Sequence, residues 1–365
     1  MSGSGKVCHA AKIKETPYGD TFMAMRPIIG NPLRGYLYGH VAKIKERRRG
    51  IMGKYIVKRL LWLIPILLGI TFLSFAVIHL AGGDAAQQMA ENSGIALSRE
   101  ALEAQREALG LDRPFLVQYL DWLGGFLTGD LGTSYVSGQD VFSTFVSKLP
   151  ATLLLAVTSV ALTVVISVPL GILAAVRQNR FADYLIRMVS FVGNSLPNFF
   201  VALVLMYLFA IRFQVFPVIS AGAGWKSLAL PALTLAIAMS AKYLRQIRAA
   251  VLEELGKDYV TGARARGIPF SVTLWKSVLR CCLSTILTLL SLSIGNLLGG
   301  TAIVESIFMW DGVGKMAVDA INMRDYPVIQ AYVVWMAVIY VAVNLITDIS
   351  YRLWDPRIRL GGDAR

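Results

Sequence analysis

The chain has 365 residues, of which 55% are hydrophobic and only 16% are charged, and its formal net charge is +13. Soluble domains contain nearer a quarter of charged residues, so this composition argues against an ordinary soluble enzyme. A basic chain can also bind nucleic acid, but the apolar residues here form long uncharged segments. We therefore expect a lipid bilayer as partner, and no nucleic acid.

Five segments contain no Asp, Glu, Lys or Arg and are long enough for a helix of about 20 residues to cross a bilayer. A sixth, between Lys226 and Lys242, has only fifteen residues and contains Pro231, but Lys242 can snorkel to the interface. We predict an all-α integral membrane protein with six transmembrane helices. The predicted spans are 57–81, 150–175, 188–211, 227–246, 281–304 and 327–349.

Lys and Arg indicate the orientation of these spans, because cytoplasmic segments are enriched in them. If the N-terminus is cytoplasmic, the inside segments hold 28 of the 36 Lys and Arg residues. The segment 84–148, which would then lie outside, has nine acidic residues against four basic ones. We predict cytoplasmic N- and C-termini and a multi-pass membrane protein.

Four regions follow from this arrangement. Residues 1–51 are a basic leader without an apolar core of its own, and we expect a disordered cytoplasmic tail rather than a signal peptide. Residues 52–365 form the six-span membrane domain. Within it, 82–148 is an external cap with an amphipathic stretch suited to the bilayer interface, and 247–280 is a cytoplasmic loop.

Residues suited to catalysis are scarce. The chain has three histidines, and neither His-Glu-x-x-His nor Cys-x-x-Cys occurs, so no metal site of ordinary spacing is expected. Gly314 and Lys315 resemble the end of a phosphate-binding loop, but Met316 and Met309 occupy two required positions. We predict that the chain is not an enzyme and has no catalytic residues, no cofactor and no metal site.

The loop between the fourth and fifth spans is the most informative segment. Residues Asp258 to Arg266 can form a short helix that Gly267 stops, and their charges suit the helix dipole. Part of its surface carries only small side chains, so the helix can enter a cleft of another protein and transmit force to the spans. The alternative is an exposed loop with ordinary charges. The candidate coupling residues are Asp258, Tyr259, Ala263, Arg264, Ala265, Arg266 and Gly267.

Small and polar residues inside two spans form a second candidate set. Gly at positions i and i+4 lets another helix approach closely, and the same groove can face a pore. These residues can therefore serve helix packing or line a pore, and the sequence leaves both roles possible. The set is Asn198, Gly295, Asn296, Gly299 and Gly300.

From Met52 to Arg359 the sequence resembles the permease subunits of ATP-binding-cassette importers for dipeptides, oligopeptides and nickel. The segments that resemble the family are Ala108-Leu-Gly-Leu-Asp-Arg-Pro, Leu149-Pro-Ala-Thr, Asp258-Tyr-Val-Thr-Gly-Ala-Arg-Ala-Arg-Gly, Arg324-Asp-Tyr-Pro-Val-Ile-Gln and Asp355-Pro-Arg. The family often has proline near Thr285, after Asp84 and at Asp311, and this chain departs from it there.

The resemblance implies a multi-pass protein of the bacterial cytoplasmic (inner) membrane, in which the loop at 258–267 is the helix that docks on the ATPase. It also implies four partners besides the bilayer: a second homologous permease, two ATP-binding subunits and an external substrate-binding protein. Ser195-Leu-Pro-Asn-Phe and Gly299-Gly-Thr resemble the nickel branch, so nickel is the favoured substrate and peptides come next.

Two other function classes stay open at this stage. A secondary transporter or channel not coupled to ATP would need carboxylates within the spans, and only edge positions such as Glu305 and Asp348 exist. A structural membrane protein is the other alternative.

Overall fold

The computed structural model describes residues 59, 61–80, 86, 87, 90, 98–108, 110–220 and 224–354. The leader predicted over residues 1–51 lies outside this part of the chain. Residues 62–365 form one compact unit, separate from residues 1–61.

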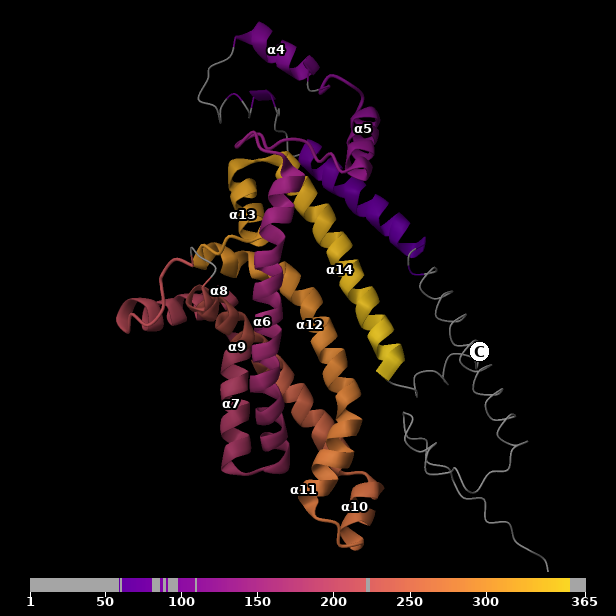
Figure 1. Cartoon of the computed structure of the whole chain (residues 1–365), viewed down its shortest axis with the longest axis vertical. Coiled ribbons are helices and arrows are strands. Elements are labelled where there is room, and N and C mark those ends of the chain that lie inside the picture. The colour runs from indigo at the N-terminus through magenta and orange to yellow at the C-terminus, as the bar shows by residue number, and fades with distance from the viewer. Residues whose placement is uncertain are drawn as a thin grey trace, which may run out of the picture. The chain divides into compact units, whose positions relative to one another are not determined.

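Regular structure in the described residues is helical, apart from an isolated bridge between Thr133 and Asp140. An unlabelled helix spans Leu61–Leu80. The labelled helices are α4 (Arg99–Ala108), α5 (Phe115–Thr128), α6 (Val141–Val176), α7 (Phe181–Ser195), α8 (Asn198–Leu205), the π-helix η1 (Met206–Arg212), α9 (Trp225–Leu255), α10 (Asp258–Ala265), α11 (Phe270–Thr273), the π-helix η2 (Leu274–Val278), α12 (Leu279–Phe308), α13 (Val313–Met323) and α14 (Tyr326–Trp354) (Figure 1).

Among the described residues, four helices are long and apolar enough to cross a membrane: Leu61–Leu80, α6, α9 and the part of α14 up to Ile346. The bent pair of α7 with α8 and η1 can be a fifth. These five coincide with five of the predicted spans, and the remaining one, 281–304, lies inside the 30-residue helix α12. The all-α membrane architecture is therefore confirmed, while six spans with cytoplasmic termini stay a prediction.

The predicted span 188–211 is wrong in one respect, because it is not a continuous helix. The axes of α7 and of α8 with η1 differ by 106° at the break between them. Pro197 disfavours helical geometry in the residue before it, and Leu196 has extended backbone angles of φ −86° and ψ 132°. Asn198 is consequently the first residue of α8, with an exposed side chain, directly after the break.

Helices α6 and α9 form the main packed pair of the unit. A row of small polar residues on α6, namely Ser159, Thr163 and Ser167, is buried. Ser159 and Thr163 each return their hydroxyl hydrogen bond to the carbonyl four residues earlier, at 2.7 Å. Gly171 lies against α9 so closely that an added Cβ would be 2.8 Å from Ile247 Cγ2. Small residues of this kind let two membrane helices approach closely.

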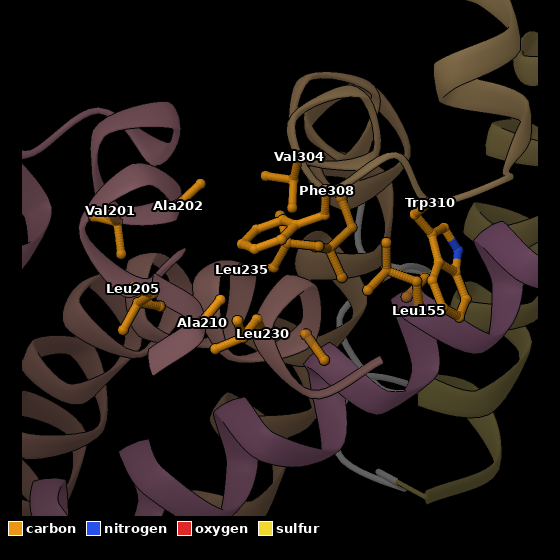
Figure 2. Close-up of a cluster of buried hydrophobic side chains, with 13 residues drawn as sticks. Leu155, Val201, Ala202, Leu205, Ala210, Leu230, Leu235, Val304, Phe308 and Trp310 are labelled. Carbon is orange, nitrogen blue, oxygen red and sulfur yellow. The ribbon is translucent and has the colours of Figure 1, made fainter. Parts of the chain in front are cut away.

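A hydrophobic core joins α6, α8, η1, α9 and α12 near the end of the unit that contains α13. Figure 2 shows Phe308 of α12 among the side chains of α9, and Trp310 beside Leu155 of α6. The Trp310 indole Nε1 donates to the Ala151 carbonyl of α6 at 3.1 Å. This core therefore fixes the end of α12 against α6, next to the buried carboxyl group of Glu305.

The segment predicted as an external cap contains α4 and α5. Ser98 accepts a hydrogen bond from the Ala101 amide at 3.2 Å and so caps α4. Helix α5 packs on the helix Leu61–Leu80 through aromatic contacts, with Tyr119 lying 5.4 Å from the Phe72 ring centroid and 2.9 Å from the Thr71 hydroxyl. His79 stacks on Phe75 in this cluster.

Candidate functional site

The short helix expected in the 247–280 loop is α10. Gly267 follows it with φ +73°, a conformation that glycine adopts without strain. The Gly267 amide donates to the Arg264 carbonyl at 2.9 Å, and the Ile268 amide donates to the Ala263 carbonyl at 3.1 Å. These bonds satisfy carbonyls at the helix end that would otherwise lack partners.

Helix α10 has one buried face and one exposed face. Val260 and Ala263 are buried, and Val260 belongs to a core cluster with Val251 of α9, Val278 of η2 and Cys282 of α12. The candidate residues that are exposed are Asp258, Tyr259, Arg264, Ala265, Arg266 and Gly267. Of the two alanines assigned together from the sequence, Ala263 therefore packs inside the chain and Ala265 faces outward.

The beginning of α10 is attached to the end of α9 by side chains. Tyr259 donates its hydroxyl hydrogen to Glu254 Oε2 at 3.0 Å, and Lys257 pairs with Glu254 Oε1. Burial and this hydrogen bond raise the pKa of Tyr259, so the phenol stays protonated and keeps donating. Helix α10 is thus joined to α9 through both polar and apolar contacts.

A buried ion pair then joins α9 to α7. Asp183 is fully buried and accepts two hydrogen bonds of 2.7 Å from the Arg248 guanidinium, one to each carboxylate oxygen. The Asn179 amide donates to the same carboxylate at 2.9 Å, and Arg187 lies 3.4 Å away. Paired bonds of this kind fix geometry as well as charge. The turn between α6 and α7 is therefore fixed to α9, two turns before α9 ends.

We expect Arg248→Met to lower the free energy of unfolding by about 3–5 kcal/mol, because it leaves a buried carboxylate without its partner. The double variant Asp183→Leu/Arg248→Met removes both charges and should recover most of this loss. Denaturant unfolding of the purified protein measures both values. The matched control is Arg113→Met, which breaks an exposed pair with Asp121 and should change stability by at most about 1 kcal/mol.

A second buried carboxyl group lies at the opposite end of α12 from α10. Glu305 is fully buried; its Oε1 accepts from the Thr152 hydroxyl at 2.8 Å and its Oε2 from the Lys315 amide at 2.9 Å. Thr152 in turn accepts from the Val313 amide at 2.9 Å. Helix α13 has no side-chain cap of its own at Gly312, and its first amides need partners. Glu305 of α12 and Thr152 of α6 supply them, so the network ties three helices together.

Two glycines make this approach possible. A Cβ at Gly312 would lie 2.4 Å from Thr152 Oγ1 and 2.5 Å from Glu305 Oε2. At Gly314 it would lie 2.7 Å from the Ala302 Cα and 2.8 Å from Glu305 Oε2. Both contacts are too close for any side chain, so the Gly-Val-Gly sequence is required by the buried carboxyl group.

We expect Gly314→Ala to destabilise the protein by about 1–3 kcal/mol, because the added methyl group overpacks the junction of α12 and α13. The control is Gly124→Ala in α5, where nothing lies within 4 Å of the added Cβ; helix propensity there predicts a slight gain. The midpoint of unfolding measures both. Equal effects at the two positions would contradict the packing argument.

The family assignment comes from comparison with known proteins. Residues 167–360 match the family "Binding-protein-dependent transport system inner membrane component", and residues 52–156 match the N-terminal component of such systems. The chain is 41% identical over 319 residues to the oligopeptide transport system permease protein AppB of Bacillus subtilis (strain 168), covering 84% of this chain and 99% of AppB. This chain belongs to that permease family. It is also 37% identical over 308 residues to the glutathione transport system permease protein GsiC of Salmonella typhimurium, with coverage of 84% and 99%.

The permease is therefore a membrane subunit of an ATP-binding-cassette importer and a multi-pass protein of the inner membrane. Importers of this class work with ATP-binding subunits and a substrate-binding protein in general. In the described part of the chain, no three His, Cys, Asp or Glu side chains gather as they would to hold a metal ion.

The second candidate set from the sequence is only partly visible in the permease. Gly295, Asn296, Gly299 and Gly300 lie within the helical backbone of α12, and their side chains fall outside the described residues. Asn198 is exposed at the start of α8 and is not brought to the Glu305 network by any contact in the described residues. Pore lining by this set stays a prediction.

Sequence reasoning missed the two buried carboxyl networks of the permease. Glu305 was noted only as an edge position, and Asp183 was not singled out. A signal for each was present, because Asp183 is the one acidic residue in the basic segment 177–187 and Glu305 is the first charge after the uncharged segment from Arg280. Asp325 behaves similarly: it is buried and accepts from the Ser134 hydroxyl and from the Tyr135 amide.

Proposed function

We propose that this permease forms half of the pore of a peptide importer, with α10 as its contact with an ATP-binding subunit. In this proposal it pairs with a second homologous permease, two ATP-binding subunits and an external substrate-binding protein. Residues 52–365 act as the six-span permease domain, 82–148 as the external cap and 247–280 as the cytoplasmic coupling loop. The chain itself has no catalytic role.

The observation that supports α10 in this role is its division into two faces. Val260 anchors the helix in the core, while Arg264, Ala265 and Arg266 are exposed on it. A charged, exposed helix held rigidly by its other face is suited to receive a push from a partner. The contacts through Glu254 and the Asp183–Arg248 pair would pass that push to α9 and α7.

Helix α12 connects the end of the unit that contains α10 with the end that contains α13, and could carry a displacement between them. Helix α12 begins beside the core cluster that contains Val260 and ends at Phe308, one turn after Glu305, and its 30 residues correspond to about 45 Å. Figure 1 shows α10 and α13 at opposite ends of α12. In the proposal, closure of the ATPases displaces α10, and α12 conveys the displacement to α13 at the external end.

Peptides replace nickel as the proposed substrate. The sequence comparison with the nickel branch rested on short segments, whereas the two relatives described above, named for oligopeptide and glutathione transport, align over 84% of this chain. Neither of these two is named for nickel.

The test is ATP-driven uptake by the whole complex reconstituted in liposomes with its binding protein. We expect uptake of short peptides that requires ATP and all partners, and no uptake of Ni²⁺. Uptake of Ni²⁺ without peptide would overturn the substrate assignment. Uptake that persists when the ATPase is inactivated would instead favour a secondary transporter or channel.

A further inference from the structure

A pocket of about 170 Å³ lies at the α13 end of the permease unit, between the 134–137 turn, the start of α6, α13 and the start of α14. Typical small-molecule sites have roughly 300–1,000 Å³, so this pocket has room for one end of a ligand and not for a whole peptide. Its walls contain two amines, Lys148 and Lys315, and an apolar floor that includes Val141, Met316 and Val328.

The two lysines are held in the walls, while their ion-pair partners lie nearer the solvent. The Lys148 side chain is 25% exposed and its partner Asp311 is 77% exposed. The Lys315 side chain is 19% exposed and its partner Asp319 is 44% exposed. In each pair the aspartate is the more exposed partner, and an ion pair screened by solvent contributes little, so each aspartate can give way to another carboxylate while the ammonium group stays in place.

The positions of both lysines are set by the Glu305 network. The backbone amide of Lys315 donates a hydrogen bond to Glu305. Lys148 precedes Thr152, which also donates to Glu305, by four residues on α6, so Lys148 and Thr152 lie on one helix face. The third carboxylate of the pocket, Asp325, is occupied by Ser134 and Tyr135 and does not compete for the amines. The pocket thus combines two rigidly placed cations, two replaceable carboxylates and an apolar floor.

Resting on the proposed peptide transport, we propose that this pocket binds the carboxyl-terminal residue of the peptide during its passage through the permease. The free carboxylate pairs with Lys148 and Lys315 in place of Asp311 and Asp319, and the last side chain lies on the apolar floor. A peptide end suits this site because one residue supplies both the anion and the apolar group. The site selects peptides with a free carboxyl terminus and an apolar last residue.

The experiment compares uptake of the dipeptide leucyl-leucine with that of its carboxyl-terminal amide by the complete reconstituted complex. Losing charged hydrogen bonds to a ligand typically costs tenfold or more in affinity. We expect the Lys148→Met/Lys315→Met variant to raise the KM for the free acid about tenfold and to leave the KM for the amide unchanged. Asp311→Asn/Asp319→Asn removes the competing carboxylates and should lower the KM for the free acid.

Lys226→Met is the control for loss of a lysine, because Lys226 lies at the start of α9 and does not line the pocket. Equal KM values for the free acid in wild type and in the double lysine variant would overturn this proposal and leave peptide transport standing. An equal effect on acid and amide would overturn it as well. Weaker binding of the peptide-free binding protein to the double lysine variant would also overturn the proposal, because the two lysines would then contact the binding protein and not the peptide. If the wild-type complex transports no peptide, the proposed function itself fails.

Discussion

Replacing Glu305 with alanine is expected to destabilise the permease by about 3–5 kcal/mol. The substitution leaves the Thr152 hydroxyl and the Lys315 amide without acceptors in a buried site, and each unsatisfied buried group costs about 1–3 kcal/mol. The cavity left by the missing carboxyl group adds to the loss. Because the first turn of α13 then lacks its cap, we also expect peptide uptake to be lost. Unfolding of the purified protein and uptake by the complex are the measurements.

A double-mutant cycle shows whether the network, rather than bulk packing, is responsible. Glu305→Gln preserves the size of the side chain and one acceptor oxygen, so its cost should be smaller than that of alanine. Thr152→Val preserves shape but leaves the Val313 amide unpaired. Residues in one hydrogen-bond network couple by about 0.5–3 kcal/mol, so the two losses should not add. Strict additivity would contradict a shared network.

The rate at which a cysteine on α13 is labelled reports on the position of this helix, which the free energy of unfolding does not. In a single-cysteine variant at Met323, an exposed position at the end of α13, we expect faster labelling when Glu305 is replaced by glutamine. The same cysteine in the Arg248→Met background is the control, because that pair lies toward the α10 end and should leave α13 in place. Equal labelling rates in both backgrounds would contradict a local role of Glu305.

The positions of the helices could largely be predicted from the sequence, because absence of charge over about 20 residues is a strong physical requirement for crossing a bilayer. The break in the third predicted span could not be predicted. Pro197 was visible, but the same residue type is accommodated inside α9 at Pro231. Whether a proline breaks or merely bends a helix depends on what neighbouring helices supply to the freed backbone groups, and a single sequence does not contain that information.

The buried polar networks could not be predicted for a different reason. Thr152 and Glu305 are 153 residues apart, and Asp183 and Arg248 are 65 apart. The first pairing exists only because α6 packs against α12, and the second only because α7 packs against α9. The helix α10, by contrast, is local: its charges, its small residues and its terminating glycine lie within ten consecutive positions, and so its start and end followed from the sequence.

Replacing Gly267 with glutamate is expected to abolish the coupling of ATP hydrolysis to transport while the protein still inserts in the membrane. Most side chains at φ +73° are strained by about 1–2 kcal/mol, and a carboxylate there would also draw Arg264 and Arg266 away from a partner. The added side chain would not clash with the rest of the chain, since nothing lies within 4 Å of a Cβ at Gly267. Any larger effect must therefore come from the surface that α10 presents. The measurement is stimulation of ATPase activity by the liganded binding protein.

Two further variants at Gly267 separate the backbone from the surface. Gly267→Asn tolerates the left-handed conformation and adds no charge, so coupling should persist. Gly267→Ala has the strain without the charge and should be intermediate. If alanine and glutamate are equally damaging, the backbone turn and not the docking surface is essential. If the glutamate variant couples normally, α10 is not the contact with the ATPase, and the route through α12 to Glu305 must begin at another element.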